Sequence, residues 1–286
     1  MTRVAVVGHV EWVEFAHVEH VPRAGEIVHA SGTWEVPAGG GPGAAVQMAK
    51  LAGEPCLFLT ALGDDHLGHR AERELGTLGL RVEAVFRPEA QRRAFVLVDA
   101  NGERTITVIG ERLGANGSDP LPWELLSGCD AVYFTAGDED ALRRARAARV
   151  LVATSRVFRL LVEAGVELDA VVRSARDPGE PFVEGLLRPP PRLVVSTAGL
   201  EGGTWEGAEG RTGTWKAAAV PGPVVDTYGA GDSFAGGLTF ALGAGMGIEE
   251  ALSVAARCGA ASLAGRGPYE RQLTAADLRT GPVRSP

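Results

Sequence analysis

The sequence predicts an α/β protein with a mostly parallel central sheet flanked by helices and a small antiparallel β lid. Short apolar runs of the buried-strand kind alternate with helical patterns along the chain, which indicates βαβ units. Glycine accounts for 39 of the 286 residues, as expected where a chain turns tightly or approaches a ligand closely. Two alternating strands near residue 100 are joined by an Asn-Gly turn, which is the strongest short hairpin signal.

In the first half of the chain, each expected strand of the central sheet is followed by a helix. Val4–Val7 is a short run of apolar residues and is expected to be the first buried strand. A glycine-rich segment then opens a helix over Ala44–Leu51, which Gly53 ends. Cys56–Thr60 is the next strand, and the helix after it, Leu67–Leu78, places its apolar residues on one face. This order is typical of parallel strands joined by helices.

The second half of the chain continues the same alternation. The runs expected as buried strands are Ala131–Phe134, Leu151–Ala153, Ala170–Val172 and Leu193–Thr197. Helical patterns around Ala141–Ala148 and Phe158–Glu163 separate them, and further helices are expected after Gly231 through Leu242 and near Leu252–Leu263. Open α/β proteins of this length often form one domain, so residues 1–286 are predicted to be a single domain.

Two stretches depart from this alternation of strands and helices. Arg93–Val98 and Arg104–Ile109 alternate apolar and polar residues across the Asn-Gly turn. Glu26–Val36 is also strand-like, and no helix separates it from the first strand. We expect these stretches, about residues 10–36 and 92–110, to form a small antiparallel sheet that acts as a lid. A purely structural edge hairpin is the alternative.

Composition indicates which kinds of binding partner and which cellular location are to be expected for this protein. The chain has 28 Lys and Arg against 36 Asp and Glu, so its formal net charge is −8, which argues against nucleic-acid or membrane-surface binding. No run of about 18 apolar residues occurs, so a membrane span is not expected. The three cysteines, Cys56, Cys129 and Cys258, are widely spaced and are expected to be free thiols in a cytoplasmic protein.

The most informative segment runs from Val224 to Gly237, where a strand end, a glycine-flanked turn and a helix start follow one another. Gly229 and Gly231 let the chain turn with its N–H groups exposed, and the helix start adds unpaired donors and a partial positive charge. These features predict an anion pocket for a phosphate. Asp232 lies at its rim and is a candidate general base, and the alternative is that it only caps the helix.

The segment Asp226–Phe234 resembles the C-terminal signature of the ribokinase-like (PfkB) carbohydrate kinase family. Further matches to the family pattern, in the same order and spacing, are Gly39-Gly40 with the helix ending at Gly53, Gly63-Asp64-Asp65 with Gly68, and Asp99–Arg104. The resemblance covers about residues 3–278. It implies a ribokinase-like fold and transfer of a phosphoryl group from ATP to a hydroxymethyl oxygen of a sugar or sugar-like substrate.

The resemblance also implies roles for single residues. Asp232 matches the family's catalytic base, and Gly229-Ala230-Gly231 matches the anion hole that stabilises charge on the transferring group. The residues that match the strand and loops around the nucleotide are Thr197, Gly199, Gly202, Arg266 and Gly267. The chain contains no GxxxxGK[ST] P-loop, so this turn has to supply the phosphate contacts.

Mg²⁺, and in some family members K⁺, are the cations that the resemblance implies. Asp226 and Tyr228 match positions that can hold a monovalent cation, the tyrosine through its carbonyl oxygen. The family's Asn-x-x-Glu segment, which helps to place Mg²⁺, falls on the residues from Ser174 to Asp177, with Glu180 nearby. Asp177 is therefore a candidate for holding a metal-bound water.

The sugar side departs from the family pattern more than the ATP side. The family's substrate-binding Asp falls on Val13, with Glu11 and Glu14 the nearest carboxylates, and its Asn after the Gly-Gly pair falls on Ala44. The residues expected to line the acceptor site are Glu11, Val13, Gly39, Gly40, Gly41 and Ala44. Since a site built for hydroxyl groups rejects analogues that lack them, exchanging polar groups for apolar ones should change the substrate.

Several alternatives remain open from the sequence. Trp12 and Glu11 are interpreted as substrate contacts, and Phe15 as part of a homodimer contact through the lid. The leading hypothesis is a sugar kinase. A nucleoside kinase of the same family is favoured if Trp12 stacks on a base, and a catalytically silent ligand-sensing protein is the third candidate.

Overall fold

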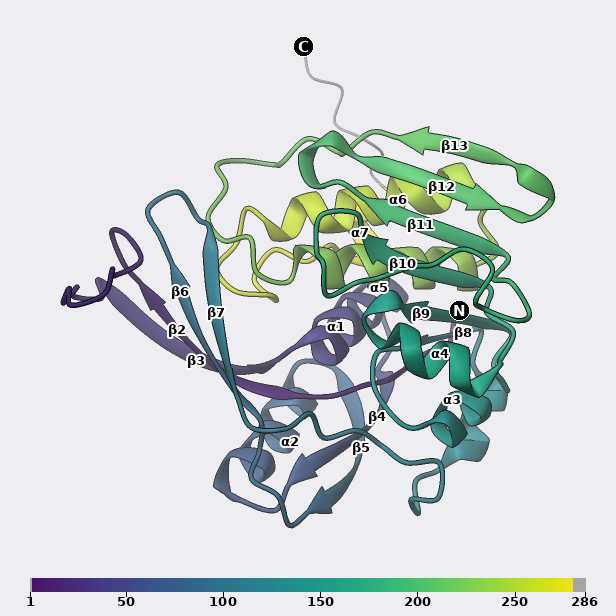
Figure 1. Ribbon diagram of the computed structural model, residues 1–286, viewed down its shortest axis with the longest axis horizontal. Coiled ribbons are helices and arrows are strands. Elements are labelled where there is room, and N and C mark those ends of the chain that lie inside the picture. The colour runs from purple at the N-terminus through teal and green to yellow at the C-terminus, as the bar shows by residue number, and fades with distance from the viewer. Residues whose placement is uncertain (1, 280–286) are drawn as a thin grey trace.

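Nine strands form the central sheet, in the order β13-β12-β11-β10-β9-β8-β1-β4-β5 (Figure 1). The computed structural model describes residues 2–279. The strands are β1 (Val4–Val7), β4 (Cys56–Gly63), β5 (Leu80–Arg87), β8 (Ala131–Phe134), β9 (Val150–Thr154), β10 (Ala170–Ser174), β11 (Leu193–Thr197), β12 (Gly203–Gly207) and β13 (Thr212–Trp215). All pairs from β11 to β5 are parallel, while β12 and β13 add an antiparallel edge.

Helices cover both faces of this sheet because successive side chains of its strands are buried on opposite sides. Val4 and Val6 of β1 belong to one buried cluster, and Ala5 and Val7 belong to the other. The helices over the first face are α1 (Gly40–Ala52), α2 (His66–Thr77), α5 (Ala230–Gly243) and α6 (Ile248–Ser262), and those over the second face are α3 (Glu139–Ala145) and α4 (Phe158–Ala164). The short helix α7 (Ala275–Arg279) contacts α1.

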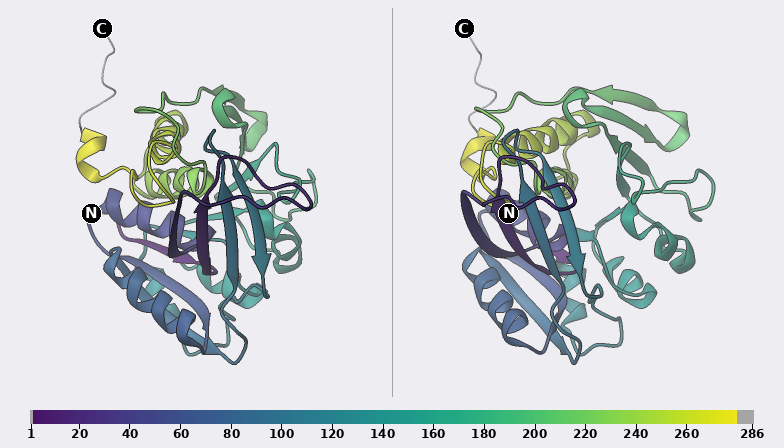
Figure 2. Two further views of the ribbon diagram at one scale, coloured as in Figure 1. Left: turned by 90° about the vertical axis from the view of Figure 1, so that its left-hand side faces the viewer. Right: turned by 60° about the vertical axis from the view of Figure 1, so that its left-hand side comes forward.

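Four strands form a second, smaller sheet, here called the lid after the prediction, in the order β3-β2-β6-β7. They are β2 (Glu11–His17), β3 (Gly32–Ala38), β6 (Arg93–Val98) and β7 (Arg104–Ile109). Figure 2 shows this second sheet from two further sides, standing beside the main domain. Val13 and Phe15 on its inner face are buried together with Tyr228, which precedes α5. The lid therefore packs on the segment that leads into the predicted phosphate turn.

The structure refines the predicted lid in two ways. The outer pairs β2–β3 and β6–β7 are antiparallel as predicted, but β2 and β6 pair in parallel, so the lid is a mixed sheet. The third strand begins at Gly32, six residues after the predicted start at Glu26. The reason is local, because the Glu26 carboxylate accepts a hydrogen bond from the backbone N–H of Arg23 at 3.0 Å and bonds to His20 at 2.8 Å.

The structure also shows the state of the three cysteines. Cys56, Cys129 and Cys258 are all free and buried, as predicted. Within residues 2–279, no helix combines the length and the apolar content that a membrane crossing requires.

Candidate active site

The turn before α5 has the shape that an anion pocket needs. Gly229 is left-handed at φ 82°, and a Cβ added to it would lie 2.8 Å from Cβ of Pro268, so other residues would clash there. Gly231 is exposed, and a Cβ at this position would meet no atom within 4 Å. The N–H groups of Ala230, Gly231 and Asp232 belong to the first turn of α5 and have no partner within the helix.

Asp232 lies in this first turn, but it does not cap the helix. The N-cap residue is Gly229, and no side chain caps α5, so the capping interpretation is wrong. Its carboxylate forms no hydrogen bond or ion pair with any residue between 2 and 279. Burial raises the pKa of Asp232 to about 6, with a further increase from nearby Glu180 and a decrease from Arg104. A carboxylate without a partner and with a pKa near neutrality can accept a proton during a reaction.

The first turn of α1 lies against Asp232. A Cβ added at Gly43 would lie 2.8 Å from Cβ of Asp232, and one at Gly40 would lie 3.2 Å from its Oδ1. No side chain caps α1 at Gly39, and its first turn contains no acidic residue. Two uncapped helix starts therefore meet at one carboxylate, and both contribute partial positive charge there.

The residues predicted to contact the nucleotide lie at the end of β11, in the turn after it and in the loop after α6. Thr197 ends β11, and Gly199 and Gly202 shape the tight turn after it with φ values of 64° and 86°. Arg266 is exposed after α6, and Gly267 follows it. The N–H of Gly267 donates a hydrogen bond of 2.9 Å to the Asp226 carboxylate, which ties this loop to the turn before α5.

Comparison with known proteins identifies the protein family to which this chain belongs. The model of the pfkB family of carbohydrate kinases matches residues 1–177 and 182–275. The chain belongs to this family. An ATP-dependent ribose-1-phosphate kinase from Halopiger xanaduensis is 32% identical and covers 91% of each chain. The predicted family and enzyme class, an ATP-dependent sugar kinase, are therefore confirmed.

Solved structures agree with the predicted ribokinase-like fold of this pfkB-family kinase. A ribokinase from Thermotoga maritima superimposes with a TM-score of 0.79 at 21% identity, covering 98% of this chain and 99% of the other. A ribokinase from Arabidopsis thaliana, solved in complex with ribose and ATP, gives a TM-score of 0.76 at 19% identity, covering 98% of each chain. At these identities the superpositions establish the fold alone.

The residues predicted for the acceptor side of the kinase fall into two groups. Gly39, Gly40 and Gly41 form the start of α1 beside Asp232, and Glu11 is close to them, 8% exposed and 3.5 Å from a Cβ added at Gly39. Val13 and Ala44 are fully buried, the first in the lid cluster and the second between α1 and α5. The apolar residues at these two family positions therefore contribute packing instead of hydrogen-bonding groups.

The interpretation of Trp12 as a substrate contact is wrong. Trp12 is fully buried and points to the opposite side of β2 from its neighbour Val13. Its Nε1 donates a hydrogen bond of 3.0 Å to Glu35, and the guanidinium of Arg70 lies 4.4 Å from the ring centre. Since protein atoms cover the ring, it cannot stack on a base, and the observation that would have favoured a nucleoside kinase is missing.

The interpretation of Phe15 as a dimer contact is also wrong. Phe15 is 1% exposed, because its ring stacks on Trp34 at 4.7 Å and meets the edge of Tyr228 at 5.0 Å. The exposed apolar side chains on the outer face of the lid are instead Phe95 and Ile109, at 41% and 48%. A homodimer through the lid stays a prediction, and these two side chains are the ones it would use.

The predicted monovalent-cation position contains a buried carboxylate. Asp226 is fully buried, and its two oxygens accept hydrogen bonds from the N–H groups of Tyr228 at 2.8 Å and Gly267 at 2.9 Å. No ion pair with Asp226 occurs in the part of the chain that the structure describes, and burial raises the pKa of its carboxyl. A buried negative charge without a cationic side chain fits a bound cation such as K⁺.

The predicted magnesium segment contains two carboxylates that one arginine joins. Arg156 donates to Oδ2 of Asp177 at 2.6 Å and to Oε1 of Glu180 at 2.7 Å. Glu180 also accepts a bond from the N–H of Ser174 and lies close enough to Asp232 to raise the pKa of that carboxyl. The sequence interpretation named Glu180 only as a nearby residue and missed Arg156, although Asp177-x-x-Glu180 has the spacing of the family's Asn-x-x-Glu segment. In this register Asp177 takes the Asn place and Glu180 the Glu place.

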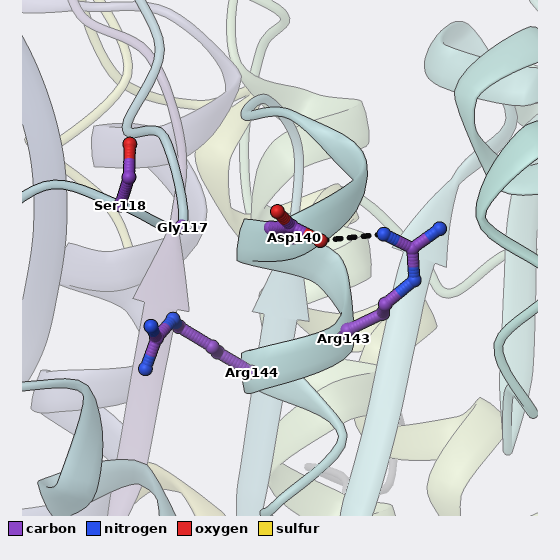
Figure 3. Close-up of a pocket in the computed structure, with 5 residues that line it drawn as sticks. All are labelled: Gly117, Ser118, Asp140, Arg143 and Arg144. Carbon is purple, nitrogen blue, oxygen red and sulfur yellow. Dashed lines mark hydrogen bonds and ion pairs between the residues drawn. The ribbon is translucent and has the colours of Figure 1, made fainter.

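A cavity of about 440 Å³ lies outside this site (Figure 3). Gly117, Ser118, Asp140, Arg143 and Arg144 line it, and Asp140 pairs with Arg143 at 2.5 Å. Its arginines belong to α3, which covers the other face of the central sheet from α5. None of the residues predicted from the sequence for the kinase site lines this cavity.

Proposed function

We propose that this kinase transfers the γ-phosphoryl group of ATP to a hydroxymethyl oxygen of a ribose-type sugar bound beside Asp232. The observation that carries the proposal is the unpaired Asp232 carboxylate, with a pKa of about 6, between the uncapped first turns of α1 and α5. The relative from Halopiger xanaduensis is named for ribose 1-phosphate, and the two superimposed structures are ribokinases. Ribose and its phosphates are therefore the acceptors to examine first.

In the proposed mechanism, Asp232 accepts the proton of the acceptor hydroxyl while that oxygen attacks the γ-phosphorus. The bond from the γ-phosphorus to the bridging oxygen of ATP breaks, and ADP leaves with that oxygen. The N–H groups of Ala230 and Gly231 donate to the oxygens of the transferring phosphoryl group, where negative charge increases. Arg104 links the lid to this turn, because it donates to the carbonyl and hydroxyl oxygens of Thr227 at 3.1 Å each.

Asp177 and Glu180 are the residues proposed to hold Mg²⁺, through water. Mg²⁺ usually binds one or two carboxylates and keeps water and substrate phosphates as its other ligands, and when bound it neutralises charge on the phosphates. Asp177 and Glu180 fit this arrangement, since they are two carboxylates that one arginine holds close together. Arg156 keeps both carboxylates in place and limits their negative charge.

Asp226 and the carbonyl oxygen of Tyr228 are proposed to hold K⁺ behind the turn. A cation at this position would balance the buried Asp226 carboxylate, whose hydrogen bonds fix both Tyr228 and Gly267. Because Tyr228 directly precedes Gly229, this contact would also hold the N–H groups of the turn in their positions.

The proposed function predicts that D-ribose, D-ribose 1-phosphate or both are phosphorylated with consumption of one ATP per product. We expect measurable turnover with Mg²⁺ present when ADP release is followed for each acceptor and the product is identified by mass spectrometry. The absence of any phosphorylated sugar from a panel of pentoses, hexoses and their phosphates would rule out the function.

The pH dependence of kcat/KM for the acceptor reports the protonation of Asp232. The base has to be ionised, and burial raises its pKa to about 6, so activity is present above this pH and is lost below it. We expect kcat/KM to fall about tenfold for each pH unit below about 6 and to be level from pH 7 to 8. Burial and three nearby arginines hold the pKa of His9 well below its usual value, so His9 is neutral over the level part of the profile from pH 7 to 8. A profile that is flat from pH 5 to 8 would contradict the assignment.

A further inference from the structure

Next to Asp232 lies a group of charged side chains that the proposed phosphoryl transfer does not use. This group, here called the His9 cluster, consists of His9, Glu11, Arg92 and Arg112. His9 follows β1, Glu11 begins β2, Arg92 precedes β6 and Arg112 follows β7, so four separate segments bring it together. A Cβ added at Gly40 would lie 3.2 Å from Asp232 Oδ1 and 4.0 Å from His9 Cε1, so the cluster and the base are neighbours.

The His9 cluster contains more positive than negative charge. Glu11 is its single carboxylate, and it accepts a hydrogen bond from Arg92 Nε at 2.7 Å. Nε2 of His9 lies 3.7 Å from the same carboxylate, but His9 is neutral near pH 7, because burial and the charges of Arg112 and Arg92 lower its pKa. Arg112 forms no hydrogen bond or ion pair with any residue in the described range, and its side chain is exposed. One guanidinium is therefore left without a counter-charge.

Placing this second guanidinium near Arg92 costs free energy unless an anion binds between them. Arg92 Nη1 donates a hydrogen bond of 3.3 Å to the carbonyl oxygen of Gly110, two residues before Arg112, so the two arginines lie on neighbouring segments. Partial burial and the charge of Arg92 both lower the pKa of Arg112, which agrees with this placement. Guanidinium groups bind phosphate through two parallel hydrogen bonds and are more weakly hydrated than ammonium groups, so they suit a phosphate monoester. The uncapped first turn of α1 adds partial positive charge on the same side of Asp232.

We propose that the acceptor of this kinase is a sugar phosphate whose existing phosphate binds Arg112 and Arg92 while its hydroxymethyl group lies at Asp232. This inference rests on the proposed function and specifies its substrate class. In a pentofuranose 1-phosphate, the phosphate is on C1 and the hydroxymethyl group is on C4, the two carbons that flank the ring oxygen, so one molecule can contact both the His9 cluster and the neighbouring base. The proposal also accounts for Val13 and Ala44, since a bound phosphate supplies affinity that lost hydroxyl contacts do not.

The test compares D-ribose 1-phosphate with D-ribose and D-ribonate as acceptors, in the wild-type chain and in Arg112→Gln. We expect the wild type to use the phosphate at least about 100-fold better than ribose, measured as kcat/KM, and to use ribonate poorly. Arg112→Gln should lower kcat/KM for ribose 1-phosphate roughly 100-fold and change that for ribose less than about threefold. Arg112→Lys keeps the charge and should recover most of the loss.

The matched control is Arg93→Gln. Arg93 is the neighbour of Arg92, but it points to the outer face of the lid, where it pairs with Glu14 at 2.5 Å. This variant should use both acceptors like the wild type. The proposal is overturned if ribose or ribonate is used as well as ribose 1-phosphate, or if Arg112→Gln lowers the activity with ribose and its phosphate equally. In these cases the sugar kinase itself stands, whereas failure with every sugar and sugar phosphate would remove the proposed function.

Discussion

Replacing Asp232 with Asn is expected to lower kcat by about 10²–10⁴, the usual contribution of a general base. The amide has the same shape as the carboxyl, and Asp232 has no hydrogen bond or ion pair with residues 2–279, so the fold should not change. The KM values for ATP and for the acceptor should change little, because the variant removes a proton acceptor and leaves the N–H groups of the turn in place. Steady-state kinetics and thermal unfolding of the purified variant measure both expectations.

Asp140→Asn is the matched control for Asp232→Asn. Asp140 is also an acidic residue in the first turn of a helix, but α3 lies over the other face of the sheet. Both variants remove one negative charge from the first turn of a helix. Only Asp232→Asn should lose turnover. A decrease in kcat of less than about tenfold would show that Asp232 is not the base.

Replacing Gly231 with Ala is expected to reduce kcat about 100-fold or more while the protein becomes more stable. An added Cβ meets no atom of the protein within 4 Å, so the folded chain accepts it without a clash. Alanine is favoured over glycine in a helix by up to about 1 kcal/mol. The same Cβ would project toward the start of α5, where the transferring phosphoryl group is proposed to bind, and losing contacts in an anion hole costs about 10²–10³ in kcat.

Gly76→Ala separates these two effects. Gly76 is exposed near the end of α2, and a Cβ there also meets nothing within 4 Å. The control should gain similar stability in thermal unfolding and keep full activity. If Gly231→Ala is as active as Gly76→Ala, the open space in front of Gly231 does not hold the phosphoryl group.

Strands that are buried on both faces could be predicted from the sequence, because a continuous run of apolar residues is stable only in the interior of the protein. The bounds of β1, β8 and β11 agree with the prediction to the residue. β5 was missed although Leu80, Val82 and Ala84 alternate with the polar residues Arg81 and Glu83, since the strand follows α2 almost directly. β12 and β13 are edge strands of Gly, Thr, Trp and Glu in which half-buried and exposed residues alternate, so no apolar run marks a strand.

The candidate site could be predicted only where its residues are close in the sequence. The turn from Gly229 to Asp232 is continuous, so its glycines and its acid could be interpreted together. Arg156 and Glu180, by contrast, meet through folding, as do His9, Arg92 and Arg112. No spacing rule marks such a cluster, because it forms where loops from several strands of the two sheets converge. Trp12 shows a second limit of the sequence. The sequence does not reveal which face of β2 this side chain occupies, and in the structure it packs against Arg70.

The most direct measurement of the central claim is a crystal structure of the kinase with a non-hydrolysable ATP analogue and a bound acceptor sugar. We expect the acceptor oxygen at roughly 2.6–3.2 Å from the Asp232 carboxylate and the terminal phosphate within hydrogen-bond distance of the Gly231 N–H. A terminal phosphate bound elsewhere, with no acceptor oxygen in contact with Asp232, would contradict the account.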